Sequence, residues 1–269
     1  MGRRKTFYWT MAAALVFFVC SIGCQANRED SLDKIKKAGY IRIAMNGGYP
    51  PFSFFNAKNE LDGFDVDLAR EVARRLGIQV KIIEVDWKDI ITGLNSNAFD
   101  AILGSMAITE ERMKKVDFSI PYYYSRTHVM VPKDSKIKDL STDLKDKTVG
   151  VMEGTTFEDD ARRLGIKHIR LYKNNDGAIA GLSKKEVDAI ITDEIVGMHS
   201  KSSSNVSIEP IGDPLSNERM AISFRKGDES LIKKVNEILK EMQKDGTLKQ
   251  YVVKMASGGY NENNSKSKK

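Results

Sequence analysis

From Tyr40 onward the chain alternates short segments rich in β-branched residues with amphipathic helical segments, and this alternation restricts the fold more than any other feature. In the helical segments apolar residues recur every three or four positions, as they do over 65–76. This order of elements is typical of parallel sheets that are covered by helices. The sequence therefore predicts an α/β fold.

The alternation runs in two series, which predicts two lobes of similar topology. The first series has expected strands at 41–45, 80–85 and 101–104 and expected helices at 65–76, 89–95 and 109–116. The second has expected strands at 148–152, 169–172 and 189–192 and expected helices at 157–164 and 176–184. A last strand at 220–224 precedes one or two helices over 229–255, with a break near Asp245 and Gly246. The hexapeptide Ala-Arg-Arg-Leu-Gly-Ile occurs at 73–78 and at 161–166, each time at the end of an expected helix. Either an internal duplication or coincidence explains this repeat.

The length and charge of the chain fit two compact lobes and exclude one class of partner. Single hydrophobic cores stop growing near about 250 residues, and this chain has 269. Of the formal charge of +6, Arg3, Arg4 and Lys5 supply +3 and residues 258–269 supply +2. The nearly neutral body lacks the basic face that nucleic-acid binding requires, so we expect no nucleic-acid partner. Residues 258–269, rich in Asn and Lys, are expected to form a disordered tail.

The N-terminus has the pattern of a secretory signal peptide. Three basic residues precede an apolar run over 7–20, and small residues follow it. The run is shorter than the ~20 apolar residues that cross a bilayer, although a retained anchor helix is the alternative interpretation.

Cys24 is the expected site of a lipid anchor. The chain contains two cysteines, Cys20 and Cys24, so the body has no disulfide framework. Gly23 and Cys24 close the apolar segment and resemble a bacterial lipobox, although Ser21 replaces the usual Leu. We therefore expect a signal peptide over 1–23, a lipidated Cys24, a tether over 24–31 and a place on the extracytoplasmic face of the cell membrane. A plain secretory signal is the alternative.

Five motifs carry a resemblance to a known family. They are Gly-Phe-Asp-Val-Asp-Leu-Ala at 63–69, AILGSMAITEER at 101–112, Val-Asp-Phe-Ser at 116–119 with Pro-Tyr-Tyr at 121–123, Gly-Thr-Thr at 154–156, and DAIITD at 188–193. In this order they resemble the polar amino-acid solute-binding proteins of ABC importers. The resemblance implies a type II periplasmic-binding-protein fold, with two α/β lobes, two crossover strands and a ligand between the lobes. It places lobe 1 at 32–122 and 222–257 and lobe 2 at 127–215.

The function that the resemblance implies is an extracytoplasmic receptor that delivers a polar amino acid to an ABC permease. We expect a monomer without a cofactor. A secreted cyclohexadienyl or arogenate dehydratase is the enzymatic alternative, for which Glu153 and Glu194 are candidate acids, and a sensor input domain is the third. A free amino acid has about ten non-hydrogen atoms, and even tiny ligands gain at most about 1.5 kcal/mol per atom. Both charged ends must therefore be matched inside an enclosing cleft.

The resemblance assigns the ligand carboxylate to Arg112. The planar fork of a guanidinium suits a carboxylate better than the point charge of Lys does. Thr155 and Thr156 precede an expected helix whose free N–H groups would face the same carboxylate. The alternatives are a surface role for Arg112 and simple N-capping for the two threonines.

The ligand ammonium is assigned to Asp193, with help from Ser105. Asp193 follows an expected strand, and ligands of open α/β sheets bind at the carboxyl ends of strands. Capping of the next helix is the alternative role for Asp193. The resemblance also includes Gly104 and Ser105 in the ligand site.

Aromatic and uncharged residues are expected around the ligand side chain. Tyr49 and Trp87 align with the aromatic residues that enclose the ligand side chain in the family, whereas Phe52, Phe54 and Phe55 are expected to pack within the protein. Asn46 and Met152 occupy positions where relatives often carry charge, which favours a neutral polar or sulfur-containing side chain. Ala107 replaces a Thr or Ser that often donates to the ligand carboxylate.

The sequence contains no pattern for a metal site or for the common catalytic motifs. His128, His168 and His199 are too scattered for a metal pair, and no body cysteine could complete a zinc site. Neither Gly-x-Ser-x-Gly, nor a Walker-type loop, nor HExxH is present. We expect neither a metal ion nor catalytic residues.

Overall fold

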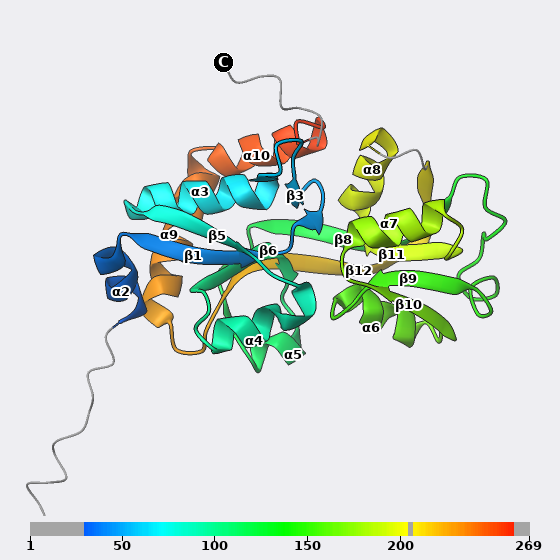
Figure 1. The fold of residues 1–269 in the computed structure, drawn as a ribbon, viewed down its shortest axis with the longest axis horizontal. Helices are drawn as coiled ribbons and strands as arrows, with labels where there is room; N and C mark the ends of the chain where they lie inside the picture. The colour runs from blue at the N-terminus through cyan, green and yellow to red at the C-terminus, as the bar shows by residue number, and fades with distance from the viewer. Residues whose placement is uncertain (1–29, 204–206, 261–269) are drawn as a thin grey trace, which may run out of the picture.

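The computed structural model describes residues 30–203 and 207–260, which form two lobes (Figure 1). The first lobe contains strands β1 (Tyr40–Met45), β5 (Gln79–Glu84), β6 (Ala101–Ala107) and β7 (Asp117–Phe118), a small sheet of β2 (Gly48–Tyr49), β3 (Ser53–Phe55) and β4 (Leu61–Asp62), and helices α2 (Ser31–Ala38), α3 (Phe64–Leu76), η1 (Trp87–Asp89), α4 (Ile90–Asn95), α5 (Glu110–Met113), α9 (Glu229–Lys244) and α10 (Thr247–Ala256). The second contains β9 (Thr148–Met152), β10 (His168–Tyr172), β11 (Ala189–Asp193), α6 (Thr156–Arg163), α7 (Asn175–Ser183) and α8 (Glu194–Ser203). Two long strands, β8 (Tyr123–Pro132) and β12 (Ile208–Phe224), run from one lobe to the other.

One mixed sheet extends through both lobes. Its strand order is β10-β9-β11-β8-β12-β6-β1-β5, and β7 pairs with β12. β1 pairs in parallel with β5 and β6, and β9 pairs in parallel with β10 and β11. In Figure 1, α3 and α10 cover one face of the first lobe and α4 covers the other, while α7 and α6 do the same in the second lobe. The predicted α/β class is therefore confirmed.

The hexapeptide that occurs twice has the same structural role both times. α3 ends at Leu76, and Gly77 follows in the left-handed conformation with φ of 73°. α6 ends at Arg163, and Gly165 adopts φ of 70°. Glycine is favoured there because this backbone conformation places a Cβ against the neighbouring carbonyl in other residues. Each copy then leads into a parallel strand of the main sheet.

The crossover strands are longer than the sequence indicated. The expected last strand at 220–224 is only the end of β12, whose earlier part carries too many polar residues for a strand pattern. β12 pairs with β8 from Met220 opposite Tyr123 to Ser216 opposite Thr127, and the register shifts before Ile211. β6 is longer than expected and continues to Ala107, whereas α5 is shorter than expected and spans only Glu110–Met113.

The ends of the described region differ from the expected tether and tail. Asp30 caps α2, because its carboxylate accepts the N–H of Leu32 at 2.8 Å, so the helix begins at the end of the expected tether. Tyr260 is buried and donates to Asp67 at 2.8 Å, so the ordered body includes the start of the expected tail. The expected signal peptide, Cys24 and residues 261–269 lie outside the described residues. Within residues 30–203 and 207–260, none of the helices has the length and apolar character to span a membrane.

Candidate ligand site between the lobes

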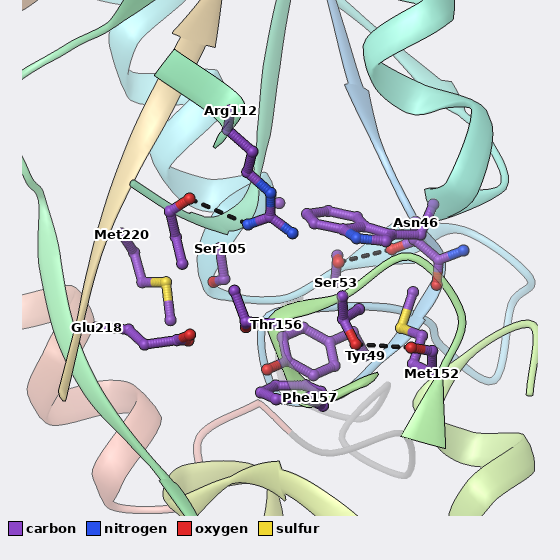
Figure 2. A pocket seen from close by; sticks show the side chains of 14 residues that line it. Asn46, Tyr49, Ser53, Ser105, Arg112, Met152, Thr156, Phe157, Glu218 and Met220 are labelled. Carbon is purple, nitrogen blue, oxygen red and sulfur yellow. Dashed lines mark hydrogen bonds between the residues drawn. The ribbon is translucent and has the colours of Figure 1, made fainter. Parts of the chain in front are cut away.

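A small cavity, partly open to solvent, lies between the lobes. Its walls come from the segment after β1, from the ends of β6 and β9, from the start of α6 and from the crossover strand β12. Open α/β sheets bind ligands at such carboxyl ends of strands. The lining residues are Asn46, Tyr49, Ser53, Trp87, Gly104, Ser105, Ala107, Arg112, Met152, Thr155, Thr156, Phe157, Glu218 and Met220 (Figure 2).

Eight of the nine residues that the sequence assigned to the ligand line this cavity. They are Asn46, Tyr49, Trp87, Gly104, Ser105, Arg112, Thr155 and Thr156. The ninth, Asp193, does not belong to the lining. Contacts with a ligand remain a prediction for all nine.

Arg112 reaches the cavity from the short helix α5. Thr109 caps this helix by accepting the N–H of Arg112 at 3.1 Å, which orients its first turn. The guanidinium donates to the carbonyl of Ala107 at 3.0 Å and to that of Gly154 at 3.4 Å. Among the described residues no carboxylate lies within ion-pair distance of it. Burial lowers the pKa of Arg112, but a guanidinium keeps its charge at any physiological pH.

The carbonyl of Gly154 connects the lobes at the rim of the cavity. It accepts the indole Nε1–H of Trp87 at 3.1 Å as well as the Nη2–H of Arg112. Lys88 adds an ion pair to Glu153 at 3.4 Å. The conformation is therefore closed, because Gly154 of the second lobe contacts Trp87 and Arg112 of the first lobe.

The aromatic walls are in place on the side of the first lobe. Tyr49 is buried and stacks on Phe52, with ring centroids 5.2 Å apart. Trp87 is also buried, and the guanidinium of Arg112 lies 5.7 Å from its ring centroid. Phe52 and Phe54 pack in the core as expected, whereas Phe55 is 42% exposed.

The small and uncharged residues of the site shape the remaining walls. A Cβ at Gly104 would lie 3.4 Å from the ring of Trp87, in ordinary van der Waals contact, so the backbone of β6 lies close to the indole. Asn46 accepts the N–H of Gly48 at 3.0 Å and donates to the carbonyl of Val85 at 3.3 Å. Met152 lines the cavity beside them, so this end of the site carries no formal charge.

The two threonines of the Gly-Thr-Thr motif have different roles. Thr155 precedes α6, but its hydroxyl donates to the carbonyl of Met152 at 2.6 Å and forms no cap to the helix. Thr156 is the first residue of α6 and lines the cavity with Phe157. The first N–H groups of a helix lack partners within the helix, so this turn offers donors to an anion.

Ser105 is held by two residues from other motifs. Its hydroxyl donates to Asp65 at 3.0 Å, and its backbone N–H donates to the hydroxyl of Tyr122, which in turn donates to Asp65 at 3.0 Å. Ser105 has φ of 50°, an uncommon conformation for a residue other than glycine. Burial raises the pKa of Asp65 to about 7, although both hydrogen bonds lower it. Three of the motifs thus converge on one buried network behind the cavity.

Asp193 ends β11 with both carboxylate oxygens engaged. Oδ2 accepts the hydroxyl of Ser125, and Oδ1 accepts the N–H of Ile195 at 2.7 Å in the first turn of α8. This is the capping role that the sequence left as the alternative. Burial raises the pKa of Asp193 to about 7, against the lowering effect of these two hydrogen bonds.

Four residues of the cavity lining were not predicted from the sequence: Glu218, Ser53, Phe157 and Met220. Glu218 lies on β12, in the polar part of the strand that carried no strand pattern. Burial raises the pKa of Glu218, whereas a hydrogen bond from Thr156 and the charge of Arg112 lower it. Among the described residues, Glu218 supplies the carboxyl group of the cavity lining and Arg112 its guanidinium.

The described part of the chain holds no cluster of three or more His, Cys, Asp or Glu residues that could bind a metal ion. The two candidate acids of the enzymatic alternative lie outside the cavity lining. Glu153 pairs with Lys88, and Glu194 forms two hydrogen bonds of 2.8 Å with Arg126.

Comparisons with known proteins agree with this architecture. The L-cystine-binding protein TcyJ of Escherichia coli (strain K12) is 34% identical over 249 residues, which cover 91% of this chain and 92% of that protein. The arginine-binding extracellular protein ArtP of Bacillus subtilis (strain 168) is 31% identical, over 95% of this chain and 99% of the relative. Among solved structures, the ancestral amino acid-binding protein AncCDT-1, a precursor of cyclohexadienyl dehydratase, matches with a TM-score of 0.79 and 35% identity, over 84% of this chain and 99% of its own.

The family model that matches this chain covers nearly the whole body, residues 41–256. The type II binding-protein architecture inferred from the five motifs is therefore confirmed. The chain belongs to the bacterial extracellular solute-binding proteins, family 3.

Proposed function

We propose that this chain is a lipid-anchored extracytoplasmic receptor that encloses a polar amino acid between its lobes and delivers it to an ABC permease. The observation that carries the proposal is the guanidinium of Arg112, which enters an interlobe cavity without an ion-pair partner among the described residues. Arg112 is partly buried, and a partly desolvated cation without a counterion is costly, so a ligand carboxylate would supply the counterion. The relatives TcyJ and ArtP, named for binding cystine and arginine, support an amino acid as the ligand.

The other walls fit the remaining parts of an amino acid. The first turn of α6, with Thr155 and Thr156, adds donors for the carboxylate from the second lobe. Tyr49 and Trp87 would enclose the side chain, and Asn46 and Met152 favour one that is neutral and polar or contains sulfur. Asp193 and Ser105 remain our candidates for binding the ammonium group of the ligand. Lipidation of Cys24 would keep the receptor beside the permease.

A panel of ligands tests the proposal directly. Thermal shift with the twenty standard L-amino acids and L-cystine should reveal at least one that stabilises the protein, because a ligand that binds only the folded state raises its stability. No stabilisation by any of them would contradict the proposal.

Arg112→Ala tests the role of the guanidinium with the best ligand of that panel. Calorimetry should show a loss of about 2 to 5 kcal/mol in binding free energy, which exceeds tenfold in affinity. Arg162→Ala is the matched control, because Arg162 is exposed on α6 and pairs with Glu158. A loss below tenfold for Arg112→Ala would remove this residue from the ligand site.

A dehydratase is the second candidate function, favoured by the similarity to AncCDT-1. Such chemistry requires a general acid near the leaving hydroxyl, and Glu218 is the carboxyl group that lines the cavity. Incubation with prephenate or arogenate decides between the two functions. Product formation would establish the enzyme, and its absence together with amino-acid binding would leave the receptor.

A further inference from the structure

Two ion pairs join the lobes on either side of Trp87. Asp86 of the first lobe pairs with Lys173 of the second lobe at 2.8 Å, and Lys88 pairs with Glu153 of the second lobe at 3.4 Å. Trp87 lies between the two charged residues in the sequence and lines the cavity. Three consecutive residues of the first lobe therefore bring one wall of the cavity and two charges against the second lobe.

The lobes also approach each other closely beside these pairs. The indole of Trp87 donates to the carbonyl of Gly154 at 3.1 Å, and a Cβ at Gly154 would lie 3.3 Å from the Cα of Lys88. In the segment after β10, the side chain of Asn174 would lie 2.6 Å from a Cβ at Gly48 of the first lobe. Because glycine backbone allows both contacts, the charges meet in one fixed register.

The two ion pairs have opposite polarity. The first lobe presents the acid Asp86 and then the base Lys88, and the second lobe presents Lys173 to the acid and Glu153 to the base. A closure shifted in register, with Asp86 toward Glu153 and Lys88 toward Lys173, would bring like charges together. Complementary charges of this kind favour one docked arrangement and disfavour the alternatives.

The exposure of the four side chains limits the strength of each pair. Lys173 and Asp86 are 68% and 32% exposed, and Lys88 and Glu153 are 52% and 40% exposed. Ion pairs at exposed sites shift an equilibrium by about 1.4- to 5-fold. Since each pair joins the two lobes, that shift applies to lobe closure, and through closure to ligand affinity.

We propose that Asp86, Lys88, Glu153 and Lys173 are positioning residues that dock Trp87 against the second lobe and set the register of closure around the ligand. This inference rests on the proposed function and deepens it. None of the four belongs to the cavity lining, so they act through Trp87 rather than by touching the ligand. Loss of the pairs speeds opening, and with it ligand release, more than it slows binding.

Charge reversal at the shorter pair tests the inference. Asp86→Lys and Lys173→Asp each place like charges across the lobes, and the double variant restores an opposite pair with exchanged polarity. Calorimetry uses the panel amino acid with the largest thermal shift. Each single variant should lose at least threefold in affinity, and the double variant should return to within twofold of the wild type. A side chain with a merely structural role would not be rescued by the reversed pair.

The fluorescence of Trp87 measures closure in the same variants. The chain has two tryptophans, and the other, Trp9, lies in the expected signal peptide. Stopped-flow measurements should show that each single variant releases the ligand at least threefold faster, while its association rate changes less than twofold. The double variant should recover the release rate of the wild type.

Lys167→Asp is the matched control, because Lys167 pairs with Asp146 at 2.9 Å within the second lobe and both side chains are exposed. It should keep the affinity and the release rate of the wild type. Single variants that bind as tightly as the wild type, or a double variant as weak as the singles, would overturn the inference while the receptor function stands. A wild type that binds no amino acid would contradict the proposed function, and this inference with it.

Discussion

Gly154→Ala should weaken ligand binding although residue 154 is not proposed to contact the ligand. Gly154 has φ of 75°, and an added Cβ would lie 3.3 Å from the Cα of Lys88 in the other lobe. The left-handed conformation costs a residue with a Cβ roughly 1–2 kcal/mol, in the open and the closed form alike. The tight contact with Lys88 exists only when the lobes are closed, and overpacking of this kind costs about 1–3 kcal/mol.

The two costs affect different measurements. The backbone cost lowers the free energy of unfolding, while the contact with Lys88 lowers the affinity by about 5- to 150-fold. The carbonyl of residue 154 would shift with its Cα, so its bonds from Trp87 and Arg112 would lengthen. Calorimetry with the best ligand of the panel and thermal unfolding without ligand measure the two effects separately.

Gly165→Ala is the matched control for this prediction. Gly165 has φ of 70° in the same lobe, and an added Cβ would meet nothing within 4 Å. It should lose a similar free energy of unfolding and keep its affinity. Equal affinities of Gly154→Ala and Gly165→Ala would refute the reasoning, because closure would then not depend on the contact of Gly154 with Lys88.

Two other predictions concern Asp193 and Cys24. The pKa of Asp193 is raised by burial to about 7, above the value of an unfolded Asp, so its contribution to stability is present at low pH and is lost as the pH rises through 7. The melting temperature of Asp193→Asn, measured relative to wild type, should therefore be higher at pH 8 than at pH 5.5; a difference that is independent of pH would contradict the burial of this charge. Mass spectrometry of the mature protein should find a lipid on an N-terminal Cys24, and Cys24→Ala should release the protein from membranes. An unmodified N-terminus would rule out the anchor.

The elements with strong local patterns could be predicted from the sequence. Apolar residues at helical spacing with a following glycine located α3 and α6 within about one residue of their observed bounds. The predicted break near Asp245 and Gly246 is also confirmed, since α9 ends at Lys244 and α10 begins at Thr247. In these segments the local propensity and the packing of the fold agree.

β12 could not be predicted in full, because its stability comes from pairing with β8 rather than from its own composition. Residues 215–219 include Ser, Asn, Glu and Arg, which give no strand pattern. This strand also carries Glu218, so the missed element and the missed site residue have one cause. A polar residue on a crossover strand becomes recognisable as part of a site only when the tertiary structure brings it into the lining of the cavity.

Asp193 illustrates the limit of motif reasoning within the site. The DAIITD motif correctly placed this residue at the carboxyl end of a strand. Its hydrogen bond from Ser125 depends on the register of β11 with β8, which no local pattern specifies, whereas the bond from Ile195 is local. The Asp65 network has the same origin, since it joins three segments that are distant in the sequence.

A crystal structure of the protein with the best amino acid of the panel would test the central claim most directly. We expect ligand density between the lobes, with the carboxylate within hydrogen-bond distance of Arg112 and the side chain between Tyr49 and Trp87. Density for the amino acid outside this cavity, or a guanidinium that points away from the bound carboxylate, would show that Arg112 does not hold the ligand carboxylate.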